Sequence, residues 1–289
     1  MGASLGGARM GLHIRVMMQG DIAPGMRLKN LAGWNQTPED WVRFLQANPH
    51  GCFVAEYEGQ VAGTVATIIY EGRLAWIGMV LVDPQFRGKG IGTALLATAV
   101  RYLDGQRIAC IKLDATPLGK PLYERMGFKT EYEIERRVLK RTSIVAPPAA
   151  CQIEDPGPIL AADRDFFGAD RSALLRSIIA AAPELLVSER QNAKLNGYAL
   201  GRKGSHADHL GPWIASDASA ARGTLQSFLA RSRRGLVYAD LLTDNAWARA
   251  LADERGFELS RALTRMYRGE NRHPGRPDQV CAILGPEFG

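Results

Sequence analysis

The chain has 289 residues, 46% of them hydrophobic and 23% charged, and a formal net charge of +6. This composition is typical of a soluble protein with room for two domains, and no apolar run approaches the roughly 20 residues that span a bilayer, so we expect a cytoplasmic protein without membrane binding. The positive charge would suit an anionic cofactor, whereas basic clusters that are short, separate and free of interleaved aromatic residues argue against nucleic-acid binding.

The first predicted domain follows a glycine-rich leader at residues 1–11. Apolar periodicity predicts a strand at 13–17, helices at 21–32 and 37–47, and antiparallel strands at 52–57, 60–69 and 76–82. Thr37 supplies a capping hydroxyl to the second helix, and Pro38 occupies its first helical position. Glu58-Gly59 predicts a turn between the first two of the three strands.

The remaining elements of this domain alternate between helix and strand. We expect a helix at 93–103, a strand at 108–114, a helix at 119–126 and a strand at 132–139 that completes the unit. Four prolines then stand at positions 147, 148, 156 and 158, and they predict a linker over residues 144–158. The expected domains are therefore residues 12–143 and 159–289.

A glycine-rich turn lies between the strand at 76–82 and the helix that follows it. The backbone N–H groups of residues 88–93 would have no intrahelical partners, and the helix dipole would favour a bound anion there. Glycines at 88, 90 and 92 allow positive φ and leave space for a phosphate group. Arg87 and Lys89 add two candidate cations, so the turn predicts a phosphate-binding loop.

Two well-known phosphate loops fit this turn poorly. The Walker pattern fails, because no four-residue gap separates a glycine from a Gly-Lys-Ser/Thr ending. The dinucleotide fingerprint would need glycine where Thr93 stands, although Asp114 at the end of the next strand keeps that alternative open.

A third pattern fits better. The residues Arg87-Gly-Lys-Gly90-Ile-Gly92 resemble the Arg/Gln-x-x-Gly-x-Gly/Ala coenzyme A signature of the GNAT acetyltransferase superfamily. Downstream, Leu122-Tyr123-Glu-Arg-Met-Gly127-Phe128 resembles the second motif of that family at the expected distance. The resemblance implies acetyl-CoA as cofactor and transfer of its acetyl group to a primary amine of a small molecule.

The second half of the chain repeats part of this order. A strand at 236–242, a helix at 245–251 and the exit Gly256-Phe257 parallel the strand, helix and Gly127-Phe128 of the first half, with Ala252 in the place of Tyr123. Residues 218–223 contain no Gly-x-Gly, so this half resembles a degenerate GNAT copy without a cofactor loop. The implied fold class is α/β: two tandem GNAT domains, each a mixed, mostly antiparallel twisted sheet flanked by helices, with one coenzyme A per chain.

The resemblance also assigns roles to individual residues. The implied cofactor-binding residues are Val80, Leu81, Val82, Arg87, Gly88, Lys89, Gly90, Ile91, Gly92, Thr93 and Thr116. A backbone N–H near Val80 would face the oxyanion, and Tyr123, a phenol protonated at neutral pH, would act as general acid. The family commonly carries Asn and Ala where this chain has Thr116 and Gly119.

The acceptor side is less well defined by sequence. Trp34 and Asn35 lie in the early helical region that covers the acceptor in GNAT folds, and Trp213 could form the opposite wall. Glu56, Glu71 and Asp114 are carboxylates that could reach the cleft, and none of them is singled out as the base. A non-catalytic acyl-CoA sensor remains the alternative function, and the oligomeric state is not predicted.

The four cysteines do not change this interpretation. Cys52, Cys110, Cys151 and Cys281 lack CxxC or His-pair spacing, so we expect reduced thiols and no metal site.

Overall fold

The computed structural model describes residues 11–143 and 155–289. The predicted leader and most of the predicted linker therefore lie outside the described residues. Helix α5 (Pro156–Phe167) begins inside the expected linker, because proline is tolerated in the first turn of a helix and the Asp155 side chain caps the N–H of Gly157. Within the described residues, no helix is both long and apolar enough to cross a membrane.

The first half follows the predicted order of elements. Its bounds are β1 (His13–Val16), α1 (Ile22–Leu31), α2 (Pro38–Ala47), β2 (Phe53–Tyr57), β3 (Gln60–Tyr70), β4 (Leu74–Val82), α3 (Ile91–Gly105), β5 (Cys110–Ala115), α4 (Lys120–Arg125) and β6 (Lys129–Lys140). Thr37 and Asp40 form a reciprocal capping box at the start of α2, where the sequence predicted a capped helix.

The second half repeats this architecture. After α5 come α6 (Ser172–Ala181), β7 (Val187–Gln191), β8 (Lys194–Lys203), β9 (Asp208–Ala215), α7 (Ala218–Arg231), β10 (Leu236–Leu242), α8 (Ala246–Glu254), β11 (Glu258–Gly269) and β12 (Val280–Ala282). The predicted internal repeat is confirmed in atomic detail. The N–H of Phe128 bonds to the carbonyl of Tyr123, and that of Phe257 bonds to the carbonyl of Ala252, each after a glycine of positive φ.

All twelve strands described belong to one sheet, in the order β1-β2-β3-β4-β5-β11-β6-β10-β12-β9-β8-β7. Most neighbours are antiparallel, and β4–β5 and β9–β10 are parallel. The α/β fold class with a mostly antiparallel sheet flanked by helices is thus confirmed. The continuity of the sheet across both halves was not predicted.

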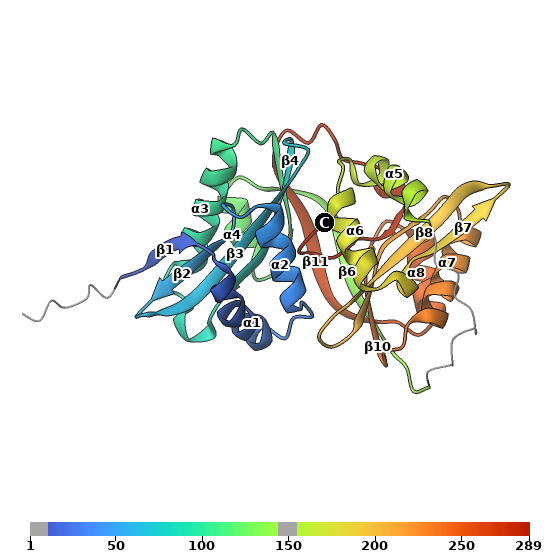
Figure 1. Ribbon diagram of the computed structural model, residues 1–289, viewed down its shortest axis with the longest axis horizontal. Coiled ribbons are helices and arrows are strands. Elements are labelled where there is room, and N and C mark those ends of the chain that lie inside the picture. Colours follow the sequence, from blue (N-terminus) through green and yellow to red (C-terminus); the bar gives the residue numbers. More distant parts are fainter. Residues whose placement is uncertain (1–10, 144–154) are drawn as a thin grey trace, which may run out of the picture.

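The two halves exchange their last long strands. β11 lies between β5 and β6, and β6 pairs with β10 on its other side, so both strands stand at the centre of the molecule in Figure 1. The expectation that the strand at 132–139 completes the first unit is therefore wrong. Strand β11 of the second half takes that place beside β5, which puts residues of both halves next to the same site.

The apolar side chains form cores on both faces of the sheet. Along β4, Leu74 and Trp76 join one buried cluster with α1, α2, α5 and α6, whereas Ala75 and Ile77 join another with α3 and α4. Alternate residues of a strand point to opposite faces, so the uninterrupted apolar sequence of β4 reflects burial on both sides. Strand β4 is thereby packed between the two cores.

Candidate active site

The strands β4 and β5 are paired over only part of their length. Residues 74–76 of β4 pair in parallel with residues 110–112 of β5, and β4 continues to Val82 without that neighbour. The opened edge leaves backbone groups of residues 77–82 free to meet an extended ligand as a further strand would. Val80, Leu81 and Val82 all lie on this splayed part of β4.

A bulge lies within the splayed part. Between the pairs Ala66–Gly78 and Thr64–Leu81, two residues of β4, Met79 and Val80, stand opposite one residue of β3. Met79 adopts a φ of 55°, and its carbonyl accepts a hydrogen bond of 2.8 Å from the Thr64 hydroxyl. A bulge of this kind turns peptide groups out of the ladder. No sequence pattern predicted the conformation of Met79, because an apolar strand residue does not indicate its own φ.

The predicted phosphate loop leads directly into α3. Gly88 and Gly90 have φ values of 77° and 76°, as predicted, whereas Gly92 lies inside the first helical turn and has no positive φ. Helix α3 begins at Ile91, two residues earlier than predicted. Its first intrahelical bond of 3.0 Å joins the N–H of Ala94 to Gly90, and no side chain caps the helix. The N–H groups of residues 91–93 are thus available to an anion.

The side chains of the loop divide into two groups. Arg87, Lys89 and Thr93 are exposed beside the helix start, where they can contact an anion. Ile91 is buried in the core, so only its backbone can serve a ligand. Leu81 is likewise a core side chain, while Val80 and Val82 are only partly buried.

The corresponding helix of the second half begins differently. Helix α7 is capped by Asp217, whose carboxylate accepts a hydrogen bond of 2.8 Å from the N–H of Ala220. A carboxylate at the helix start satisfies an orphan N–H and repels a phosphate. A phosphate at the start of α7 would therefore meet a carboxylate of its own sign.

Tyr123 projects from α4 into the opening between the strands. Its side chain is largely buried, and burial raises its pKa to about 12. Its hydroxyl forms no hydrogen bond with any described residue. A Cβ atom on Gly119 would lie 2.9 Å from the Tyr123 ring, so the glycine found where the family commonly has alanine gives the ring space.

A cavity joins these features. It is lined by residues 77–80 of β4, by Asp114, Thr116 and Tyr123, and by residues of both halves: Trp34, Gln36, Arg136, Arg261, Leu263, Pro286 and Glu287. The opened strand, the bulge and the buried phenol therefore share one enclosure.

Glu287 enters the cavity wall from the C-terminal segment, which folds back into the centre of the molecule (Figure 1). The peptide is anchored by hydrogen bonds of 2.9 Å from Trp76 Nε1 to the carbonyl of Pro286 and from the Tyr70 hydroxyl to the carbonyl of Phe288. No motif spacing in the sequence predicted this return of the chain end.

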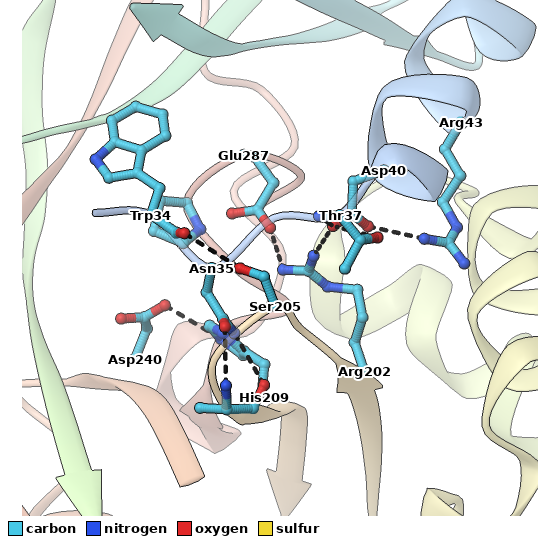
Figure 2. A network of polar contacts seen from close by, with 12 residues as sticks. Trp34, Asn35, Thr37, Asp40, Arg43, Arg202, Ser205, His209, Asp240 and Glu287 are labelled. Carbon is cyan, nitrogen blue, oxygen red and sulfur yellow. Dashed lines mark hydrogen bonds and ion pairs between the residues drawn. The ribbon is translucent and has the colours of Figure 1, made fainter. Parts of the chain in front are cut away.

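A buried ionic network holds the Glu287 carboxylate. In Figure 2, Arg202 lies between Glu287 and Asp40, donating to both, and Arg43 donates to the other oxygen of Asp40 at 2.7 Å. Burial raises the pKa of Glu287, but the positive charges of Arg202 and Arg136 outweigh burial, so its pKa lies below the ordinary value. Glu287 is therefore ionised at neutral pH.

Only one of the three predicted acceptor residues lines the cavity, namely Trp34. Asn35 is buried one residue further on, where its side chain bonds to the backbone of His206 and Ala207. Trp213 is a core residue that donates a hydrogen bond of 2.8 Å to Thr224. Asn35 thus links the two halves, and Trp213 packs in the core of the second half. Neither residue lines the cavity.

The three carboxylates considered as bases also differ in position. Glu56 is ion-paired with Arg15 on the outer strands, and Glu71 is ion-paired in a turn. Asp114 lines the cavity, but Arg265 occupies both of its oxygens with hydrogen bonds of 2.8 Å. Glu287, which the sequence did not single out, keeps one oxygen, Oε2, without a hydrogen-bond partner.

Two protein-family models match this chain. A family model described as Acetyltransferase (GNAT) family matches residues 26–128, and one described as Acetyltransferase (GNAT) domain matches residues 159–282. The chain belongs to the GNAT acetyltransferase family. It contains two GNAT domains in tandem, and the glycine loop and Tyr123 lie in the first of them.

Individual relatives agree with this assignment. The chain is 27% identical over 237 residues to YitH, an uncharacterised N-acetyltransferase of Bacillus subtilis (strain 168). The matched region covers 80% of this chain and 83% of YitH. It is 26% identical over 261 residues to the holothin acyltransferase of a Pseudoalteromonas species, covering 89% and 87% of the two chains. A crystal structure of a proposed acetyltransferase from Pyrococcus horikoshii shares the fold with a TM-score of 0.80 and 21% identity, over 100% of this chain and 99% of that one.

Proposed function

We propose that this tandem GNAT protein transfers the acetyl group of acetyl-CoA to a primary amine of a small molecule. The observation that carries the proposal is the position of Tyr123: its partner-free hydroxyl lines the same cavity as the bulged, opened edge of β4.

The residues of the first half fit acetyl-CoA. The uncapped N–H groups of residues 91–93 and the side chains of Arg87 and Lys89 would hold its pyrophosphate. The opened edge at residues 80–82 would pair with its pantetheine arm, and Thr116 would contact the arm from β5. When bound, acetyl-CoA supplies the thioester from which the acetyl group is transferred.

Two groups of the chain would then act on the reacting atoms. A backbone N–H near Val80, turned toward the cavity by the bulge, would stabilise the negative charge that develops on the carbonyl oxygen. The Tyr123 hydroxyl would donate its proton to the departing sulfur, a task for which its raised pKa keeps it protonated. An acceptor amine must enter neutral, from the side lined by Trp34 and Glu287.

Turnover with a panel of primary amines tests this function. Purified protein is mixed with acetyl-CoA and each amine, and release of free thiol is followed together with the mass of the acetylated product. Tyr123→Phe should abolish most turnover and leave the affinity for acetyl-CoA unchanged. Acetyl-CoA binding without turnover of any amine would instead favour the alternative of a non-catalytic sensor.

A further inference from the structure

Arg261 occupies an unusual position in the cavity wall. It lies on β11 directly opposite Arg136 of β6 in the strand register, and both side chains line the cavity. Like charges that face each other across two strands destabilise a sheet unless other groups compensate them. The charges around this pair therefore indicate which charge a ligand of the cavity would carry.

Among the described residues, the other arginines near this cavity are ion-paired, whereas the partly buried Arg261 is not. Arg136 forms two hydrogen bonds of 2.7 and 2.6 Å with Asp240, and the network of Figure 2 pairs Arg43 and Arg202 with Asp40 and Glu287. Four guanidinium groups thus face three carboxylates. Within the part of the chain that the structure describes, Arg261 has no ion pair within 4 Å, and its Nε is buried without a hydrogen-bond partner.

Arg261 nevertheless carries its charge at neutral pH. Burial lowers its pKa, and Arg136 lowers it further, to about 10. A partly buried cation without an ion pair is costly, and arginine binds carboxylates in a bidentate geometry. The group that completes this site is therefore expected to be an anion from outside the chain.

A second unpaired group lies in the same cavity wall. Oxygen Oε2 of Glu287 is buried without a partner, while Oε1 is bound by Arg202. Figure 2 shows the free oxygen on the side of Trp34, which also lines the cavity. Among the described residues, the cavity thus offers one positive group without an ion pair and one carboxylate oxygen without a hydrogen-bond partner, the complement of a molecule that carries a carboxylate beside an amine.

We propose that the acceptor is a small molecule with a carboxylate next to its primary amine, of the amino-acid type. Arg261 binds the carboxylate of the acceptor, and Glu287 faces the amine. The inference rests on the proposed acetyl transfer and names the substrate class of that same site.

Matched acceptor pairs test this inference. Each of several amino acids is compared with its decarboxylated amine, for example phenylalanine with phenethylamine and leucine with isoamylamine, by thiol release from acetyl-CoA. The amino acid should have a kcat/KM higher by roughly 10- to 100-fold, as expected for one charge-assisted bidentate pair. Glu287→Gln should lower kcat/KM for both members of every pair.

Arg261→Gln should remove the preference by raising KM for the amino acid far more than KM for the neutral amine. Its thermal stability should be kept or increased, because an uncompensated charge is lost. The control is Arg268→Gln on the same strand, whose side chain pairs with Asp104 outside the cavity. This control should retain the preference.

The possible failures are distinguishable. Neutral amines that react as well as their amino acids, or a preference that survives Arg261→Gln, would overturn the inference and leave acetyl transfer intact. Binding of acetyl-CoA without turnover of either member of any pair would also overturn it. Absence of acetyl-CoA binding would instead refute the proposed function.

Discussion

Replacing Tyr123 by phenylalanine removes one oxygen atom and leaves the packing in place. The ring contacts Phe128 at a centroid distance of 6.1 Å and fills the space beside Gly119, and phenylalanine keeps both contacts. The hydroxyl bonds to no described residue, so its removal leaves no buried donor or acceptor without a hydrogen bond. We therefore expect the free energy of unfolding to change by less than about 1 kcal/mol.

The expected effect on catalysis is much larger. A positioned general acid contributes about 10²- to 10⁴-fold to a rate, which corresponds to roughly 3–5 kcal/mol of activation free energy. The assay is kcat from thiol release at saturating acetyl-CoA and amine. Catalysis by a phenol is lost as pH rises through its pKa, so the Tyr123 contribution should persist above pH 10 and decline only as pH approaches about 12.

Tyr267→Phe is the matched control, because this tyrosine of β11 lies outside the cavity wall. It should leave kcat unchanged. A Tyr123→Phe variant with kcat within threefold of the parent would refute the acid role, and so would a basic limb that stays at the same pH in both proteins. A collapse of thermal stability would contradict the packing argument.

Three further substitutions address other parts of the structure. Gly90→Ala forces a side chain into the left-handed conformation at a cost of about 1–2 kcal/mol, and it should lower stability in urea unfolding and weaken acetyl-CoA binding in calorimetry. Asp240→Asn leaves the Arg136 charge uncompensated between the halves and should lower the free energy of unfolding by about 3–5 kcal/mol; a change below 1 kcal/mol would contradict this ion pair. Asn35→Ala removes the bonds to the loop at 205–207 and should cost about 1–3 kcal/mol, with hydrogen exchange of that loop accelerated if its backbone is released as expected.

The sequence by itself determined the features that depend on neighbouring residues. Glycines 88 and 90 predict a left-handed turn, because other residues rarely adopt positive φ. The apolar periodicity that follows predicts the helix. The resemblance to the second GNAT motif assigned Tyr123, four residues before Gly127, and comparison with that motif located the second Gly-Phe turn at residue 256. Even here helix α3 begins two residues before its predicted start, because Gly90 already supplies the N-terminal cap of the helix.

Only the tertiary structure decided how the two halves combine. An apolar strand such as β6 can pair with any suitable edge, and its choice of β10 and β11 depends on contacts more than 100 residues away in the chain. That choice brings Arg261 opposite Arg136 and places Glu287 of the chain end in the cavity wall. The glycine loop and Tyr123 belong to local motifs, so the sequence reveals them, whereas Arg136, Arg261 and Glu287 are brought together only by the tertiary structure.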